Sequence, residues 1–204
     1  MSSSRISTKT LRLTEMAILA AIVVVLQLLS YSIKIGVFNL SLVLIPIVVG
    51  AALLGVRAGM LLGLVFGIVA LLASVFGMDA GGAILWQANP LVTTLICLVK
   101  GGAAGAVSGL IIAAFRKTKH ARLGTWIGAL AAPLVNSGLF VIGMLLAFYD
   151  ILRTWAEGWQ AGVGTMQYIV FGLLGGNFLV EFALSALFAP IVLRIVEAVQ
   201  KSRN

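Results

Sequence analysis

The feature that most constrains this chain is a series of long apolar stretches, each close to the length that crosses a lipid bilayer. A membrane-spanning helix needs about 20 mostly apolar residues. Soluble domains carry about a quarter charged residues, whereas 10% of this chain is charged and 61% is hydrophobic. The sequence therefore predicts an all-α membrane protein with one domain, residues 1–204. We expect six spanning helices, at about residues 11–30, 39–54, 58–76, 90–115, 123–149 and 166–199.

Two of these spans have distinguishing features. The first follows a basic segment, as in a signal peptide, but its apolar stretch is longer than a typical signal core and ends without a clear cleavage site. We expect it to be retained as a span. The second span is short and contains Pro46, which is expected to kink it or break its hydrogen bonding.

The basic residues predict the orientation. Cytoplasmic segments of membrane proteins carry an excess of Lys and Arg. With the N-terminus inside, eleven of the fourteen Lys and Arg residues fall in cytoplasmic segments, and Lys34 and Arg153 alone fall in outer loops. Lys100 lies within a span. The sequence therefore predicts that both termini are cytoplasmic, in a multi-pass protein of the plasma membrane.

Two outer segments, residues 77–89 and 150–165, are long and contain tryptophan and acidic residues. One interpretation is an aromatic belt at the membrane surface. The other is a lid over a pocket that opens outward. Trp86, Gln87 and Asn89 could form the mouth of that pocket, or Asn89 could simply cap the helix that begins at Pro90.

Small residues recur every four positions in three spans, which places them on one helix face. In the third and fourth spans we expect these faces to pack within the protein, because small residues let helix backbones approach closely in lipid. The first span is open to a partner helix as well. These residues are Ala17, Ala20 and Ala21; Gly59, Gly63 and Gly67; and Gly101, Gly105 and Gly109.

Polar residues inside the spans are costly in lipid and therefore mark sites. Four of them, Lys100, Asn136, Asn177 and Glu181, are contributed by three spans. Counted along the helices, the first three lie at similar depths, and Glu181 lies one turn nearer the cytoplasm. Lys100 and Glu181 could form a structural ion pair. Alternatively, the group lines a substrate pocket in which Lys100 binds an anionic group and the amides bind hydroxyls or carbonyls.

Several classes of function are excluded or disfavoured. One cysteine and one histidine cannot form a disulfide framework or a metal cluster. The chain has no Walker A, HExxH or GxSxG motif, so no enzymatic activity is expected. The net charge of +8 is explained by basic cytoplasmic ends, and no nucleic-acid partner is expected. The halves show no inverted repeat, which disfavours a secondary transporter.

Over its whole length, the chain resembles one known family, the substrate-binding S components of energy-coupling factor (ECF) vitamin transporters. The resemblance rests on size, six spans, the motif Ala17-Ile-Leu-Ala-Ala21, and the stretch at residues 40–69. That stretch is punctuated by Pro46, Gly50, Gly55, Gly59, Gly63 and Gly67.

The resemblance implies that the chain binds a vitamin from outside and associates with a membrane scaffold (T) subunit and two cytoplasmic ATPases. The chain itself would bind no cofactor, since ATP is used by the partner subunits. The alanine motif, Ala17 and Ala21 with Ala20 beside them, would contact the scaffold. The pocket would be built by the outer parts of the last three spans and by the loop at residues 31–38, whose charged member is Lys34.

The ligand is less constrained than the family. A lysine in the pocket favours a carboxylate or a phosphate, and pantothenate is the first choice, ahead of folate, riboflavin and a pyridoxine-like compound. Two alternatives from other classes stay open: an autonomous small transporter or channel, and an assembly protein of the bilayer with no small ligand.

Overall fold

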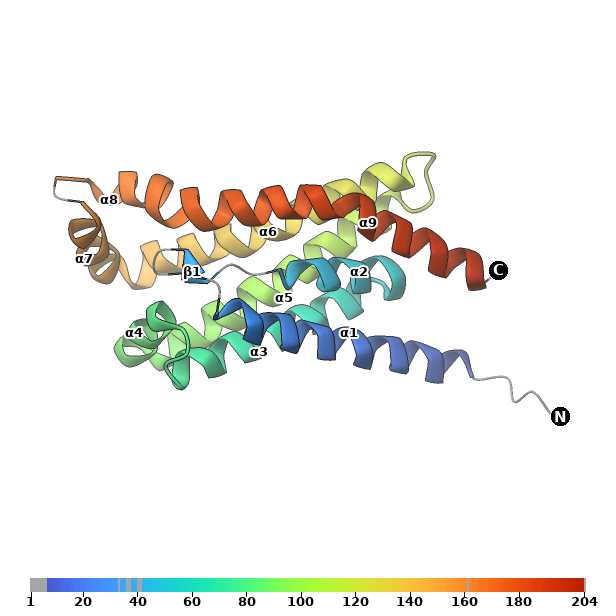
Figure 1. The fold of residues 1–204 in the computed structure, drawn as a ribbon, viewed down its shortest axis with the longest axis horizontal. Helices are drawn as coiled ribbons and strands as arrows, with labels where there is room; N and C mark the ends of the chain where they lie inside the picture. Colours follow the sequence, from blue (N-terminus) through green and yellow to red (C-terminus); the bar gives the residue numbers. More distant parts are fainter. Residues whose placement is uncertain (1–6, 33, 36–37, 40–41, 161, 204) are drawn as a thin grey trace.

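The computed structural model describes residues 7–32, 34–35, 38–39, 42–160 and 162–203. The long helices run side by side along an elongated bundle (Figure 1). The start of α1 and the end of α9 lie at one end, and the short helices α4 and α7 lie at the other, which we call the α4/α7 end. The elements are α1 (Thr8–Ser30), β1 (Lys34–Ile35), β2 (Phe38–Asn39), α2 (Leu44–Leu54), α3 (Val56–Val75), α4 (Ala80–Ala88), α5 (Pro90–Phe115), α6 (Ala121–Ala147), α7 (Tyr149–Trp159), α8 (Thr165–Gln167), η1 (Tyr168–Phe178) and α9 (Leu179–Arg203).

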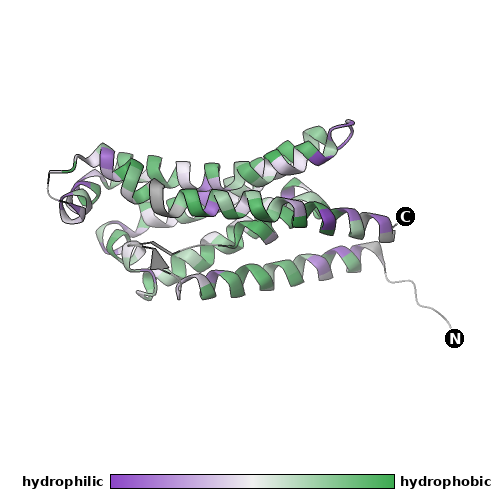
Figure 2. Ribbon diagram, turned by 45° about the horizontal axis from the view of Figure 1, so that its top comes forward, coloured by the Kyte–Doolittle hydropathy of each residue, from purple (hydrophilic) through white to green (hydrophobic). Residues whose placement is uncertain are grey.

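Five helices of the described chain are long and apolar enough to cross a membrane. These lie at Lys9–Ser30, Val56–Val75, Pro90–Phe115, Ala121–Ala147 and Leu179–Val199. Hydrophobic residues predominate along them, and hydrophilic residues gather towards the two ends of the bundle (Figure 2). A sixth apolar helix, α2, is shorter.

The short helix α2 differs from the sequence-based prediction in two details, its first residue and the position of Pro46 within it. It begins at Leu44 rather than near residue 39, because Asn39 belongs to β2, which pairs antiparallel with β1. Pro46 therefore lies in the first turn of α2, where its missing N–H has no intrahelical partner to lose. Most of α2 is buried. It packs against α1, α3, α5, α6 and α9, and so forms the centre of the bundle.

The glycine faces of α3 and α5 pack directly against each other, as predicted. A methyl group added to Gly59 would lie 2.6 Å from the Gly105 carbonyl oxygen, and one added to Gly67 would lie 2.5 Å from that of Cys97. At Gly63 an added methyl would collide with the Gly101 carbonyl. No larger residue fits at these positions, so the two backbones form one closely packed unit beside the cavity described below.

The two outer segments, expected to be loops, contain the helices α4 and α7. In α7, the buried Leu152 and Ala156 lie one turn apart, and the adjacent face carries the exposed ion pair Arg153–Glu157. A second core cluster at this end joins α7 to α4 (Leu85), α6 (Met144), the residue between α6 and α7 (Phe148) and η1 (Leu173). The segment before α9 also differs from expectation, since residues 168–178 form a π-helix rather than an α-helix.

Candidate functional site

A cavity of about 110 Å³ opens among the long helices near the α4/α7 end. A water molecule occupies about 10–15 Å³ of such a volume, so the cavity has room for a small metabolite. Its walls come from α1, α3, α4, α5, α6, η1 and α9. The polar and ionisable lining residues are Gln27, Tyr31, Ser74, Asp79, Thr93, Cys97, Lys100, Asn136, Ser137 and Glu181.

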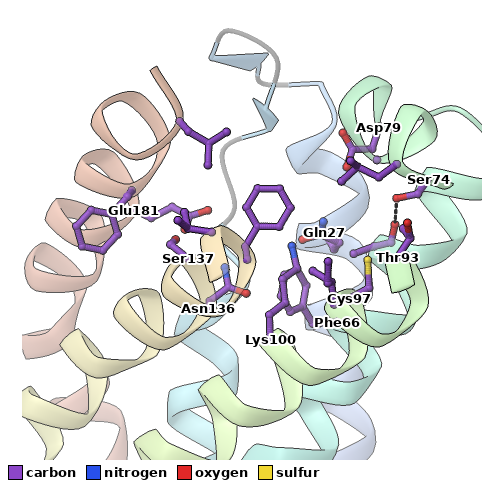
Figure 3. Close-up of a pocket in the computed structure, with 18 of the residues that line it drawn as sticks. Gln27, Phe66, Ser74, Asp79, Thr93, Cys97, Lys100, Asn136, Ser137 and Glu181 are labelled. Atoms are coloured by element: carbon purple, nitrogen blue, oxygen red, sulfur yellow. Dashed lines mark hydrogen bonds between the residues drawn. The ribbon is translucent and has the colours of Figure 1, made fainter. Parts of the chain in front are cut away.

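Lys100 extends into this cavity from the middle of α5 (Figure 3). Its ammonium nitrogen lies 5.0 Å from the centre of the Phe140 ring and 5.7 Å from that of Phe66. Aromatic faces at such distances attract a cation. Among the described residues, the ammonium group has no hydrogen bond or ion pair. Within the described part of the chain the contacts of this charge are therefore with ring faces, and the ammonium group can bind an anion.

Asn136, Ser137 and Glu181 lie together on one side of the cavity (Figure 3). Both Asn136 and Glu181 are 7% exposed. The side-chain oxygen of Asn136 is fully buried and has no hydrogen-bond partner among the described residues. A buried polar atom left without a partner costs about 1–3 kcal/mol. This oxygen is therefore a ready acceptor for a hydroxyl or amide N–H of a ligand.

Asp79, Ser74 and Thr93 lie across the cavity from Asn136 and Glu181 (Figure 3). Asp79 precedes α4, and Gly82 in the first turn of α4 packs close to it. A methyl group added to Gly82 would lie 2.8 Å from a carboxylate oxygen of Asp79 and would collide with the Ser74 hydroxyl. This glycine therefore lets α4 cover the polar wall closely.

Gln27 and Tyr31 bring the outer end of α1 into the same cavity. They lie one helical turn apart, and the Gln27 side-chain nitrogen donates a 2.7 Å hydrogen bond to the Tyr31 hydroxyl oxygen. Tyr31 is 8% exposed. Burial raises the pKa of the Tyr31 hydroxyl to about 12, because the phenolate would lose its hydration, while the Gln27 hydrogen bond acts in the opposite direction. Tyr31 is therefore neutral at physiological pH.

The structure brings three of the predicted site residues together and separates others from them. Lys100, Asn136 and Glu181 share the cavity. Trp86, Gln87 and Asn89 are not among its described lining residues. Asn89 instead caps α5, accepting a hydrogen bond from the Val92 amide at 3.1 Å, with Pro90 as the first helical residue.

Two further predicted residues have only their backbone described. Lys34 lies in β1 and Asn177 in η1, and the side chains of both fall outside the described part of the structure. Their place in the site stays a prediction.

A Lys100–Glu181 ion pair was the structural alternative to a binding pocket. The ion pairs within the described part of the chain are Arg122–Glu197, which joins α6 to α9 at 2.7 Å, and Arg153–Glu157. The side chains of Lys100 and Glu181 line one cavity without forming such a pair.

Tyr31 belongs to the loop at residues 31–38 that the resemblance placed at the pocket, but four other lining residues were not predicted: Gln27, Ser74, Asp79 and Thr93. Gln27 is an uncharged amide inside the first apolar stretch, so the cost of a polar group in lipid could have identified it. Asp79 was assigned to an outer loop, and no sequence signal showed that α4 folds back over the bundle. Ser74 and Thr93 donate hydrogen bonds to backbone carbonyls one turn earlier. Such bonds are common for these residues in helices, so neither stood out.

Comparison with known proteins identifies the family. A family model described as the substrate-specific component of ECF transporters matches residues 11–195. The chain belongs to this family. It is also similar to the pantothenic acid transporter PanT of Lactococcus lactis subsp. cremoris (strain MG1363), with 25% identity over 200 residues that cover 93% of each protein. The family consists of membrane transporter subunits and not of enzymes, and the cavity between the helices of this S component is its candidate substrate site.

Proposed function

We propose that this protein is the high-affinity vitamin-binding subunit of an ATP-driven importer, and that its ligand is a small carboxylate, pantothenate first. The observation that carries the proposal is the Lys100 ammonium, which lies in the cavity between two aromatic rings with no ionic partner among the described residues. The printed name of the relative from Lactococcus supports the choice of pantothenate.

The physical argument concerns the cost of a charge at this depth. Lys100 is ten residues into α5, about 15 Å from the start of the helix. An ammonium group there is expensive unless it is paired or faces water. A ligand carboxylate would form an ion pair with the ammonium group. This pair would offset the free-energy cost of burying the Lys100 charge.

We further propose six crossings with both termini in the cytoplasm, the α4/α7 end outside and one integral domain over residues 1–204. The start of α1 and the end of α9 lie at the same end of the bundle (Figure 1), which requires an even number of crossings. Five helices have spanning length, and the shorter apolar helix α2 is proposed to make the sixth crossing. The basic residues are in excess in the segments at the end of the bundle where α1 starts and α9 ends, which agrees with the positive-inside rule for a cytoplasmic side.

A scaffold subunit and two cytoplasmic ATPases are the partners that the family implies, and the chain itself is proposed to bind no cofactor. The docking face is proposed on α1. Ala17 and Ala21 are exposed, whereas Ala20 turns inward and packs against the core. Only 17% of the apolar window of α1 is buried within the protein, so most of the helix is available to lipid or to a partner.

The test is mass spectrometry of small molecules released from the purified protein. We expect one vitamin at close to one molecule per chain, and we expect that vitamin to raise the melting temperature by mass action. An assembly protein would release no ligand and show no such shift. An autonomous transporter would accumulate the vitamin in proteoliposomes that contain this chain alone, whereas a binding subunit would not.

A further inference from the structure

The cavity has a feature that a carboxylate bound at Lys100 leaves unused. The Tyr31 hydroxyl oxygen accepts a 2.7 Å hydrogen bond from Gln27. A phenol carries one hydrogen as well as its acceptor sites, and no described residue accepts a hydrogen bond from Tyr31. Tyr31 lines the cavity and is 8% exposed. Its hydroxyl hydrogen is thus a buried donor whose orientation is set by Gln27.

The charges nearby indicate which kind of group this donor would meet. The described lining residues include one cation, Lys100, and two carboxylates, Asp79 and Glu181. Asp79 is close enough to Tyr31 to act on it electrostatically. A second anionic group of a ligand would be repelled here. A neutral hydroxyl or carbonyl oxygen would not.

The lining of α5 indicates the length of the ligand. Thr93, Cys97 and Lys100 lie on successive turns, and all three line the cavity. The first and last are seven residues apart, which corresponds to about 10 Å along the helix. Thr93 lies on the side of Asp79 (Figure 3). The cavity is therefore longer than a single carboxylate group requires.

We propose that Tyr31, oriented by Gln27, donates a hydrogen bond to an uncharged oxygen of the ligand, and that the substrate is an elongated monocarboxylate. In this arrangement Lys100 binds the carboxylate, the Asn136 side-chain oxygen accepts from a ligand hydroxyl or amide N–H, and Tyr31 binds a hydroxyl or carbonyl oxygen towards α4. The inference rests on the proposed function and narrows its substrate class. Tyr31 is the contact residue, and Gln27 is a positioning residue that acts through it.

The experiment measures binding by isothermal titration calorimetry in detergent, with pantothenate and with panthenol, in which an alcohol replaces the carboxylate. Tyr31→Phe removes one oxygen, and Tyr149→Phe is the matched control on the exposed surface of α7. We expect Tyr31→Phe to weaken the binding of both compounds by the same factor, about tenfold, which corresponds to one lost hydrogen bond. Lys100→Gln should instead weaken pantothenate and leave panthenol nearly unchanged.

The role of Gln27 is tested by non-additivity. If Gln27 acts through Tyr31, the Gln27→Ala/Tyr31→Phe double variant binds pantothenate no more weakly than Tyr31→Phe alone. Additive losses would overturn the positioning role. Unchanged affinity of Tyr31→Phe, with wild-type protein still binding pantothenate, would overturn the inference and leave the proposed function standing. Wild-type protein that binds neither compound and no other vitamin would overturn the proposed function and the inference with it.

Discussion

The ammonium nitrogen of Lys100 lies 5.0 Å from the centre of the Phe140 ring, so a cation on α5 is held by a ring on α6 inside an apolar bundle. Phe66 of α3 approaches the same ammonium from 5.7 Å. Ring faces compensate only part of the hydration that a charge loses, since a cation–aromatic contact contributes about 0.5–2 kcal/mol. Part of the cost of burying this charge therefore remains, and the carboxylate of the proposed ligand would offset it.

The first prediction concerns this charge. Lys100→Met should weaken pantothenate binding by at least about 30-fold, since losing one partner of a buried charge pair costs about 2–5 kcal/mol. The same substitution should leave the ligand-free protein equally or more stable, because an uncompensated charge is removed from an apolar site. Calorimetry measures the first effect and thermal melting the second.

Lys117→Met provides the control, because Lys117 is exposed in the connection between α5 and α6. Both of its values should match the wild type. Lys100→Met protein that binds pantothenate normally would show that Lys100 is not the carboxylate partner.

The second prediction concerns the glycine contact between α3 and α5. Gly63→Ala should lower the free energy of unfolding by about 1–3 kcal/mol, the usual cost of overpacking, because the added methyl group collides with the Gly101 carbonyl. The α3 wall of the cavity should shift with it and binding should weaken. Thermal melting of the ligand-free protein measures the change in stability.

Gly138→Ala is the matched control. Gly138 lies inside α6, and an added methyl group meets nothing within 4 Å. Replacing a helical glycine by alanine normally stabilises by about 0.5–1 kcal/mol. Equal melting temperatures for the two variants would contradict a special role for close α3–α5 packing.

The glycine contact also illustrates what the sequence could predict. The four-residue spacing of Gly59, Gly63 and Gly67 indicates a close helix contact in lipid, and the structure confirms it. Likewise, length and hydropathy identify the long helices to within a few residues, because spanning the membrane requires both. The predicted start of α2 near residue 39 was wrong, because Asn39 pairs with Lys34 in the two-stranded sheet and the helix begins at Leu44.

The candidate site was predictable where polarity itself was the signal. Lys100, Asn136 and Glu181 stand out because they are polar residues in apolar stretches, and they line one cavity. Of the wall formed by Tyr31, Ser74 and Asp79, the resemblance covered Tyr31 alone, through the loop at residues 31–38, and Ser74 and Asp79 were not found. These residues lie near helix ends, where polar groups are common and carry little information, and their meeting depends on how α1 and α4 pack against α3 and α5.

The third prediction concerns pH. The pKa of Tyr31 is raised to about 12 in the folded protein, against about 10 for an unperturbed tyrosine. Between these values the unfolded chain loses the Tyr31 proton while the folded protein keeps it. The contribution of Tyr31 to stability is therefore fully present below pH 10 and is lost as the pH rises towards 12. Melting temperatures measured from pH 8 to 11 should fall less steeply for Tyr31→Phe than for the wild type, and parallel curves would contradict the raised pKa.

The last prediction concerns the exposed face of α1. Ala17→Trp should abolish vitamin uptake by cells that express the complete transporter, because an indole ring prevents the close approach of a partner helix that small residues allow. Binding by the purified variant should be unchanged, because Ala17 is exposed and lies three turns from Gln27, the nearest cavity residue on α1. Leu110→Trp, on the exposed surface of α5, is the control for the effect of an added indole in lipid and should support normal uptake.

If the Ala17 variant transports normally, α1 does not dock the scaffold through this face. If both binding and uptake are lost, the substitution has damaged the fold, and the smaller change Ala17→Leu, which adds bulk without an aromatic ring, should then separate uptake from binding.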